Sequence, residues 1–307
     1  MNDNLHPEQS SELPGAQWAL DDSGAFNHWR QTKIAAATRQ NTLEFINIAD
    51  LANPTLAERQ LILTRCNIDG YAFYQSSQPE TEPAIAAALR QFTNSFGLKI
   101  AETHRSMGDH GVVALRVSKN EHQRGFIPYS RKAMNWHTDG YYNAPNDTIR
   151  SFVLHCAQPA GTGGQNQIID PEIAYMRLRD LNPDYIAALM MPDAMTIPAN
   201  TEADGSVRPA SIGPVFMVEN GALIMRYTAR TRSIEWSQKA APAAAALQNI
   251  LETESEFLIQ TTLKSGQGVL SNNTLHNRTG FDQGSDPSQR LMYRIRFHNR
   301  IPGGQNG

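Results

Sequence analysis

The chain has 307 residues, enough for one large domain or two modest ones, and a chain this long buries enough surface to fold without a disulfide or a structural metal. Its formal charge is −3, from 27 Lys and Arg against 30 Asp and Glu, and 40% of its residues are hydrophobic. This composition excludes a highly charged disordered chain. The absence of a positive excess disfavours nucleic acid as a partner.

The start of the chain predicts neither a leader nor an anchor. Met1–Gly15 is polar, and no apolar run approaches the ~18 residues that cross a bilayer. We therefore expect no membrane partner and a cytoplasmic location. Two isolated cysteines, Cys66 and Cys156, predict reduced core residues rather than a disulfide. We expect residues 1–23 to be a loosely ordered lead-in and residues 24–307 to form a single domain.

Five stretches predict helices. In Glu80–Phe96 the apolar residues recur at spacings of 4, 3 and 4, the repeat of one helical face. The other stretches are Pro54–Cys66, Pro171–Arg179, Asn182–Met191 and Lys239–Phe257. The pair Asn182-Pro183 is typical of a helix start, with an N-cap followed by proline at the first helical position.

Strand-like segments lie between these helices and dominate from residue 112 onward. They are Tyr71–Gln75, Val112–Ser118, Ile149–Cys156, Gln167–Asp170, Val215–Val218, Ala222–Tyr227, Gly268–Ser271 and Arg290–His298. Strands and helices do not alternate regularly, which disfavours a parallel doubly wound sheet. The pattern predicts a mainly β fold with flanking α-helices, an antiparallel double sheet of the jelly-roll type.

Two imidazoles and one carboxylate are candidates for a metal site. His137 and Asp139 are two residues apart, so an extended backbone projects both side chains to one side, and His276 follows a strand-like run far downstream. Such a triad occupies one face of an octahedral ion and leaves room for a bidentate co-substrate and O₂, as in non-haem Fe(II) oxygenases. By itself His-x-Asp is usually incidental. A zinc-dependent hydrolase could use the same three ligands with an activated water.

The last strand-like segment alternates cleanly. Leu291, Tyr293, Ile295 and Phe297 share one face, and Arg290, Met292, Arg294, Arg296 and His298 share the other. If the second face lined a barrel interior, its arginines would need anions, and arginine suits a planar carboxylate. We expect Arg296, His298 and Arg300 to be solvated. Periodicity alone does not decide the place of Arg290 and Arg294.

Several short blocks resemble one enzyme family. His137-Thr138-Asp139, His276-Asn277-Arg278 and Gln289–Arg294 are similar to the signature blocks of the taurine dioxygenase-like (TauD/TfdA) family. Phe92–Leu98 is similar to its early helix, and Pro159–Asn166 to its Gly-Gly turn. The resemblance implies an Fe(II)- and 2-oxoglutarate-dependent dioxygenase on a distorted double-stranded β-helix, with O₂ as the second co-substrate.

The resemblance also implies roles for single residues. His137, Asp139 and His276 would bind iron, and Arg290 would hold the distal carboxylate of 2-oxoglutarate. Arg294 would contact a substrate anion or the metal-proximal end of the co-substrate. Asn166 stands where the family usually has a threonine that bonds the distal carboxylate, and its amide could donate instead. The retained carboxylate of Asp139 favours hydroxylation or a related oxidation, and the pair Asn272-Asn273 has no assigned role.

Candidate substrate-binding residues are suggested only by their positions in the sequence. Tyr141, Tyr142 and Asn143 follow the first ligand block and could line the pocket mouth, although a tyrosine pair can simply pack a loop. Arg226 could bind a small carboxylate, sulfonate or phosphonate if it points inward, although a strand end is more often solvated. His104, His110 and His122 are expected at the surface.

The combined interpretation is an Fe(II)- and 2-oxoglutarate-dependent dioxygenase that oxidises a small polar metabolite. An anionic metabolite is favoured, the products are succinate and CO₂, and a homo-oligomer is possible. The alternatives are the zinc-dependent hydrolase and a binding protein that has kept the scaffold without turnover.

Overall fold

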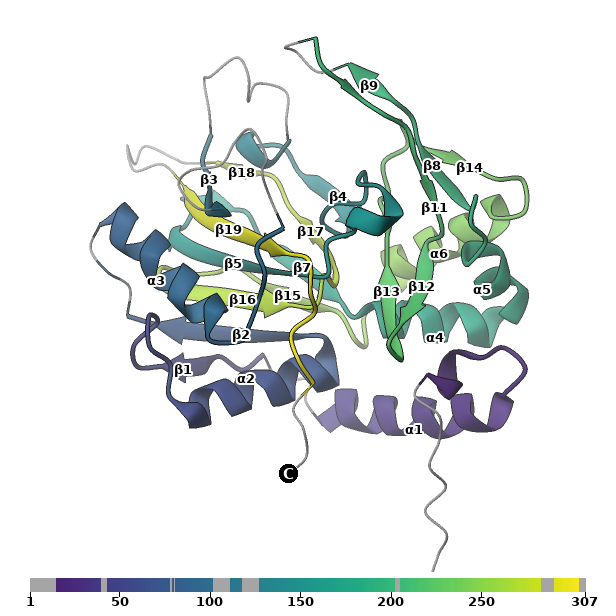
Figure 1. Cartoon of the computed structure of the whole chain (residues 1–307), viewed down its shortest axis with the longest axis horizontal. Helices are drawn as coiled ribbons and strands as arrows, with labels where there is room; N and C mark the ends of the chain where they lie inside the picture. Colours follow the sequence, from purple (N-terminus) through teal and green to yellow (C-terminus); the bar gives the residue numbers. More distant parts are fainter. Residues whose placement is uncertain are drawn as a thin grey trace, which may run out of the picture.

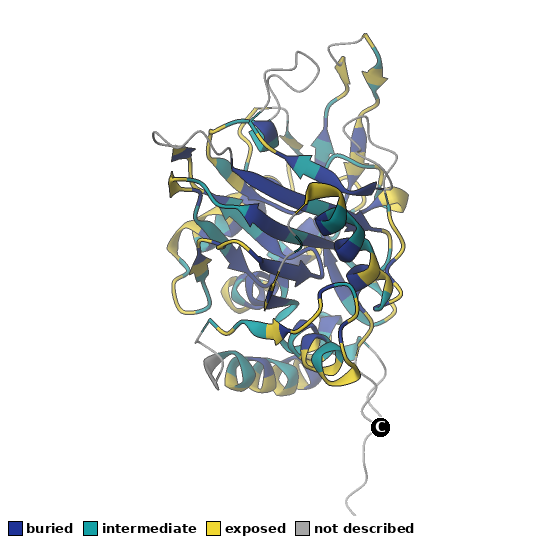
Figure 2. Cartoon of the chain, turned by 90° about the vertical axis from the view of Figure 1, so that its left-hand side faces the viewer, coloured by how far each residue is buried: buried dark blue, intermediate teal, exposed yellow. Residues whose placement is uncertain are grey.

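Two β-sheets packed face to face form the centre of the computed structural model, and helices cover their outer faces (Figure 1). The structure describes residues 15–39, 43–77, 79, 81–101, 111–117, 127–201, 205–232, 234–282 and 290–303. Figure 2 shows the buried residues concentrated in the sheets, with exposed residues on the outward sides of the helices.

The larger sheet has the strand order β1-β2-β16-β5-β19-β3. Its strands are β1 (Ile46–Ile48), β2 (Tyr71–Ser76), β16 (Gln267–Ser271), β5 (Ser151–Gln158), β19 (Leu291–Phe297) and β3 (Val113–Leu115). Only β1 and β2 run parallel to each other; the other neighbours in this sheet are antiparallel. Strands adjacent in the sheet are far apart in the sequence, as in a jelly roll.

The smaller sheet has the order β15-β7-β17-β4. Its strands are β15 (Ile259–Thr261), β7 (Asn166–Ile169), β17 (Leu275–Arg278) and β4 (Met134–His137). All its pairs are antiparallel, and the segment 227–229 continues the pairing along the free side of β4, where Thr228 bridges His137. The strands β4 and β17 were not predicted from the sequence.

Short strands and six described α-helices complete the fold, with 3-10 turns at Ala16–Trp18, Ile127–Tyr129 and Pro145–Asp147. The strands are β6 (Thr162–Gly163), β8 (Met195–Ile197), β9 (Asn200–Thr201), β10 (Val207–Arg208), β11 (Ser211–Gly213), β12 (Phe216–Glu219), β13 (Ala222–Met225), β14 (Glu235–Trp236) and β18 (Phe281–Asp282). The helices are α1 (Ser23–Arg39), α2 (Leu56–Asp69), α3 (Glu82–Asn94), α4 (Pro171–Leu181), α5 (Pro183–Leu189) and α6 (Ala241–Thr253).

The predicted elements are confirmed with small shifts of their ends. Every predicted strand overlaps an observed one, and the five predicted helices are α2 to α6. The Asn182 side chain accepts a hydrogen bond from the backbone N–H of Asp184 at the start of α5, which confirms the predicted N-cap. Helix α1 was missed because its inward face carries Arg30 and Lys33 beside Phe26, Trp29 and Ile34, which weakens the periodic apolar signal.

Three apolar clusters hold the layers together. One lies between the two sheets and includes Phe152 and Met292. A second packs the outer face of the larger sheet against α2 and α3, and a third packs the smaller sheet against α4 and α6. The alternation predicted for the last strand is confirmed, since Tyr293 and Ile295 face the helices while Met292 faces the smaller sheet. Both cysteines are free and buried.

Two expectations are corrected. Within the predicted lead-in, residues 1–14 lie outside the described residues, but Trp18 is buried and its indole N–H donates to the Gly221 carbonyl. Arg179 donates to the Gln17 carbonyl, so α4 fixes this segment. Arg296 is not solvated: it is 3% exposed and donates to the Tyr142 hydroxyl, because β19 lies inside its sheet.

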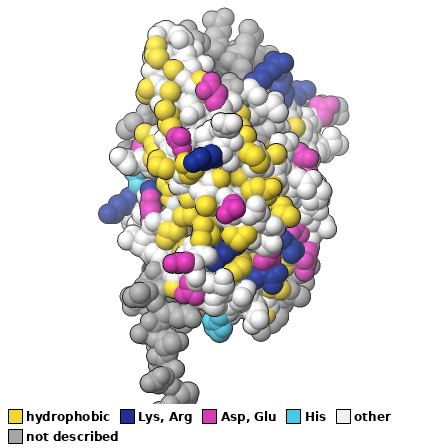
Figure 3. Space-filling model, turned by 90° about the vertical axis from the view of Figure 1, so that its right-hand side faces the viewer, with side chains coloured by type: hydrophobic (Ala, Val, Ile, Leu, Met, Phe, Trp, Pro, Cys, Tyr) yellow, Lys and Arg dark blue, Asp and Glu magenta, His cyan; other side chains and the backbone are white. Residues whose placement is uncertain are grey.

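The outer surface carries scattered apolar side chains. None of the described helices is long and apolar enough to cross a membrane. On the face carrying β8, β14 and α5, apolar side chains are mixed with single acidic and basic ones (Figure 3). Val207 and Ile212 are the most exposed large apolar residues of the β9 to β11 region. The homo-oligomer stays a prediction.

Thr55→Ala is expected to lower the free energy of unfolding by about 1 kcal/mol. The Thr55 side chain accepts from the Glu58 N–H and the Glu58 carboxylate accepts from the Thr55 N–H, a capping box at the start of α2. Urea unfolding measures the change, with the exposed Thr32→Ala in α1 as control. An equal loss in both variants would contradict the assignment.

The same capping box predicts a pH dependence. The N–H of Ala49, followed by that of Thr55, lowers the pKa of Glu58. A lowered carboxyl pKa means that this stabilisation is present above the ordinary glutamate pKa and is lost as the pH falls through the lowered value. Glu58→Gln keeps an acceptor for these N–H groups without the titrating charge, so the difference in the free energy of unfolding between the wild type and Glu58→Gln, measured by urea unfolding, should shrink in acid.

Candidate metal centre

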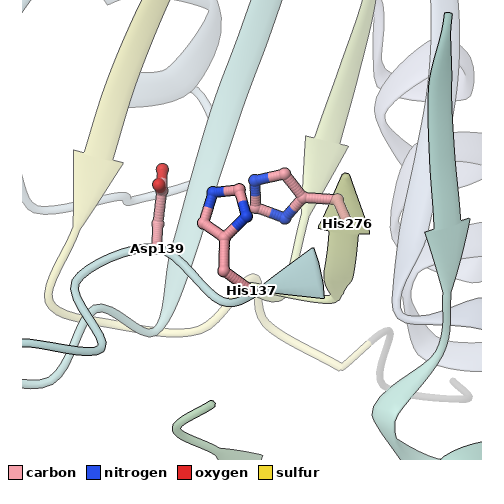
Figure 4. Close-up of side chains that lie close together, drawn as sticks. All are labelled: His137, Asp139 and His276. Carbon is pink, nitrogen blue, oxygen red and sulfur yellow. The ribbon is translucent and has the colours of Figure 1, made fainter. Parts of the chain in front are cut away.

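The adjacent strands β4 and β17 bring two histidines together. His276 is the direct cross-strand partner of His137, and their ring centroids are 4.2 Å apart. His276 follows the predicted strand β16 and lies within a further strand, β17, which the sequence did not predict. Figure 4 shows the two imidazoles side by side with the Asp139 carboxylate next to His137. One ligand atom from each of the three residues lies within 4.8 Å of the other two.

Asp139 stands in the turn that follows β4. Gly140 takes φ +69°, and a Cβ there would come within 2.5 Å of the Ile149 side chain, so the turn requires glycine. Asn273, in the turn between β16 and β17, fixes Asp139 from the other side. Its Oδ1 accepts from the Asp139 N–H at 2.8 Å, and its Nδ2 donates to the carbonyls of Asp139 and Ile149.

Both imidazoles are held with one nitrogen available. Nδ1 of His137 lies 2.8 Å from the Asn135 carbonyl, and Nδ1 of His276 lies 2.9 Å from the Thr274 carbonyl. Because a carbonyl can only accept, Nδ1 carries the proton and Nε2 is the ligand atom. Burial and then the His276 ring lower the pKa of His137 to about 3, and burial lowers the pKa of His276. Both rings are therefore in the neutral, metal-binding form at pH 7.

The carboxylate of Asp139 fits the same interpretation. Its Oδ1 accepts from Nη1 of Arg294 at 3.2 Å, while its Oδ2 is buried without a hydrogen-bond partner among the described residues. A buried carboxylate oxygen without a partner is costly unless an ion takes that place. The donor set of two neutral imidazoles and one carboxylate suits Fe(II). Among the described residues no cysteine joins this group, so it lacks the closed four-ligand shell of a structural zinc site.

A cavity opens beside the triad, lined by apolar and polar side chains. The apolar ones include Leu115, Phe152 and Leu154 of the larger sheet, and Arg294 of the same sheet is the cross-strand partner of Leu154. The polar lining residues include Asn166, Asn277, Arg278, Arg290 and Arg294, so the predicted residues Asn166, Arg290 and Arg294 all lie in the same cavity as the triad.

Two of these arginines share one aromatic neighbour. The guanidinium carbons of Arg278 and Arg290 lie 4.8 and 4.9 Å from the centre of the Phe281 ring. Burial lowers the pKa of Arg290 to about 10, and burial with the charge of Arg290 lowers that of Arg278 to about 10. Both side chains remain cationic at pH 7, so this end of the cavity attracts anions.

The Gly-Gly turn predicted before β7 closes the same end. Gly163 and Gly164 have φ values of +71° and +70°, and a Cβ on Gly163 would come within 2.4 Å of the Gly280 carbonyl oxygen. Only glycine allows this approach, which places the turn against Phe281 and Arg290.

The two tyrosines after the triad lie next to it. The Tyr141 ring is edge-on to His137 at 6.4 Å, and the Tyr142 ring is edge-on to Tyr141 at 5.3 Å. Each hydroxyl accepts from an arginine: Tyr141 from Arg230, and Tyr142 from Arg296. Burial raises the pKa of Tyr142 to about 12, so its hydroxyl stays protonated.

Two predicted substrate residues have structural contacts instead. Arg226 is 1% exposed, and its guanidinium donates to the carbonyls of Met195, Ser211 and Gly213, which uses its charge within the fold. Asn143 donates through Nδ2 to the Asp147 carbonyl and so stabilises its own loop. His104, His110 and His122 lie outside the described residues.

Sequence reasoning missed two polar residues of the site. Asn273 was noted without a role, and its positive φ of +56° reveals a turn that no periodicity signals. Arg278 was quoted only as part of a motif. Its spacing of two from His276 was the available signal, because side chains two apart on a strand share a face.

Known dioxygenases are similar to this chain in sequence. The model of the taurine catabolism dioxygenase TauD, TfdA family matches residues 82–296. A uridine-5'-phosphate dioxygenase from an Amycolatopsis species is 27% identical over 169 residues, which span 51% of this chain and 58% of that protein. A uridine-5'-phosphate dioxygenase from a Streptomyces species is 25% identical over 255 residues, 76% of this chain and 88% of that protein.

Solved structures share the fold at low identity. Asparagine oxygenase superposes with a TM-score of 0.57 at 14% identity, covering 92% of this chain and 88% of the other. The non-heme iron oxygenase OrfP, in complex with Fe, succinate and (3S)-hydroxy-L-arginine, gives a TM-score of 0.58 at 14% identity, covering 80% and 82%. The predicted mainly β jelly roll with flanking helices is confirmed.

Proposed function

The chain belongs to the taurine catabolism dioxygenase TauD, TfdA family, whose enzymes use Fe(II), 2-oxoglutarate and O₂, and we propose that it oxidises a C–H bond of a small anionic metabolite. One observation carries the proposal. The triad of His137, Asp139 and His276 lies at a cavity whose lining includes three arginines. A hydrolytic zinc site would give those arginines no common task.

The residues of the chain would bind the metal and keep water from the reacting groups. His137, Asp139 and His276 hold the metal, with the imidazoles oriented by the carbonyls of Asn135 and Thr274. Iron with bound 2-oxoglutarate supplies the activation of O₂, and the co-substrate leaves as succinate and CO₂. The apolar side chains that line the cavity would exclude water from the reacting groups.

The cavity arginines would hold the anions. Arg290 and the Asn166 amide bind the distal carboxylate of 2-oxoglutarate, because a guanidinium matches a planar carboxylate with two parallel donors. Arg294 already contacts the Asp139 carboxylate, which sets its guanidinium beside the metal position. It would contact the metal-proximal end of the co-substrate or an anionic group of the substrate.

The decisive experiment follows the metal and the co-substrate together. Fe(II) and then 2-oxoglutarate are added to the apo-protein without oxygen, and the visible metal-to-ligand charge-transfer band is recorded. We expect a band that needs both additions and disappears in His137→Ala but not in the exposed His298→Ala. Absence of the band, together with zinc-dependent hydrolysis without 2-oxoglutarate, would overturn the proposal.

An anion with an aromatic part is the substrate class we favour. The two curated relatives are named for uridine 5'-phosphate, which has both features. Tyr141 and Tyr142 offer ring surface beside the triad, and two arginines stand next to them: Arg230 on the Tyr141 hydroxyl, and Arg208 over the Tyr142 ring at 6.0 Å. We therefore propose uridine 5'-phosphate as the first compound to test, with succinate release as the readout.

Arg230→Ala is expected to raise the KM for an anionic substrate about tenfold, because an exposed guanidinium contributes about 1–2 kcal/mol to a charge-assisted bond with a phosphate. The same variant should leave the KM of a neutral analogue such as the free nucleoside unchanged. Steady-state succinate formation measures both values. Arg232→Ala removes the same charge two residues away, and an equal effect of both variants would indicate long-range charge only.

A further inference from the structure

A second arginine shares the cavity end of Arg290. Arg278 is the last residue of β17, two positions after His276, so both side chains project from the same face of that strand into the cavity. Its direct cross-strand partner on β7 is Asn166. Arg278, Asn166 and Arg290 therefore surround one end of the cavity, about 7 Å along the strand from His276.

Arg278 and Arg290 are buried cations with no anionic partner among the described residues. Each is 6% exposed, and within the described part of the chain neither has a carboxylate within 4.0 Å. The Phe281 ring contacts both guanidiniums, but a ring face offsets only part of the cost of removing two positive charges from water. Two neighbouring buried guanidiniums also repel each other, so the site is built for a bound anion.

Arg278 is also fixed in position. Its Nη2 donates to the carbonyls of Ser130 and Lys132, which holds the guanidinium plane against the 130–132 segment. Its Nε is buried and has no hydrogen-bond partner among the described residues. A side chain anchored at one nitrogen, with a further donor unsatisfied inside a cavity, has the form of a ligand-binding group rather than of a solvated charge.

We propose that Arg278 and Arg290 together bind the distal carboxylate of 2-oxoglutarate, and that Arg278 sets the preference of this enzyme for a dicarboxylate co-substrate. This inference rests on the proposed function. In this arrangement the His276 end of the cavity would hold the metal and the 2-oxo group, and Arg278 and Arg290 would receive the distal carboxylate at the other end.

The test compares two 2-oxo acids that differ only at the distal end. Both 2-oxoglutarate and 2-oxopentanoate, which has a methyl group in place of the distal carboxylate, are titrated anaerobically into the Fe(II)-loaded protein while the charge-transfer band is recorded. We expect Arg278→Met to weaken 2-oxoglutarate binding at least tenfold and to leave 2-oxopentanoate binding within about twofold. Arg131→Met, which removes an exposed arginine paired with Asp282, should change neither.

The outcomes distinguish a failure of the role proposed for Arg278 from a failure of the proposed dioxygenase function. A variant that binds both acids equally more weakly would show that Arg278 only supports the fold, and an unchanged preference for 2-oxoglutarate would show that Arg290 acts alone. If Arg278→Met fails to fold, Arg278→Gln serves, because it keeps an amide donor while removing the charge; a retained preference there overturns the inference. A wild-type protein that binds neither acid contradicts the proposed function instead.

Discussion

Asp139→Asn is expected to lower the affinity for Fe(II) by more than about 100-fold. Loss of a residue that only supports a metal ligand costs about 10–100-fold in affinity, and loss of a ligand should cost more. The substitution keeps the shape of the side chain but removes the charge that an Fe(II) ion needs from its single carboxylate ligand. It also leaves Arg294 without its anion, since Nη1 of Arg294 lies 3.2 Å from Oδ1 of Asp139. Turnover should fall with the metal.

The measurement is an anaerobic competition between the protein and a chelator of known Fe(II) affinity. Asp282→Asn is the control, because Asp282 is an exposed carboxylate paired with Arg131 at the surface. Circular dichroism of both variants reports whether the fold is kept. An Asp139→Asn protein that retains Fe(II) within threefold of the wild type would remove Asp139 from the metal site.

Asn273→Ala is expected to lower the free energy of unfolding by about 3–5 kcal/mol. Three buried backbone groups lose their partner: the N–H and carbonyl of Asp139 and the carbonyl of Ile149. Each unsatisfied group costs about 1–3 kcal/mol, and neighbouring losses do not add fully. A further cost of about 1 kcal/mol comes from placing alanine at a φ of +56°.

Asn273→Gly separates these two causes. Glycine adopts positive φ without strain, so the difference between the two variants measures the strain and the remainder measures the lost hydrogen bonds. Because Asp139 loses its support in both, each should also bind Fe(II) about 10–100-fold more weakly. Urea unfolding of the apo-protein and the chelator competition give the two readouts, with the exposed Asn146→Ala as control. A loss of stability with full metal affinity would show that Asn273 acts on the fold alone.

Local sequence patterns predicted most of the longer helices and strands. The 4, 3, 4 spacing in Glu80–Phe96 marks the face of α3 that packs on the larger sheet, and the alternation in the last strand separates the helix side of β19 from its cavity side. Both signals come from burial on one side of a regular element. Helix α1 gives a weaker signal, because its inward face includes Lys33, which pairs with Asp170 and Glu172 rather than with apolar side chains.

The sequence by itself determined the mainly β class, the chemical types of the candidate ligands and the short blocks that resemble one family. Tertiary structure decided which residues meet. Asp139 and Asn273 are separated by 134 residues, and only the pairing of β4 with β17 brings their turns together. Arg226 and Arg278 are both arginines at the C-terminal end of a strand, Arg226 just after β13 and Arg278 as the last residue of β17. Arg226 donates to backbone carbonyls through both Nη atoms, whereas Arg278 donates to two carbonyls through Nη2 alone and lines the cavity, because the acceptors around a buried charge come from segments distant in the chain.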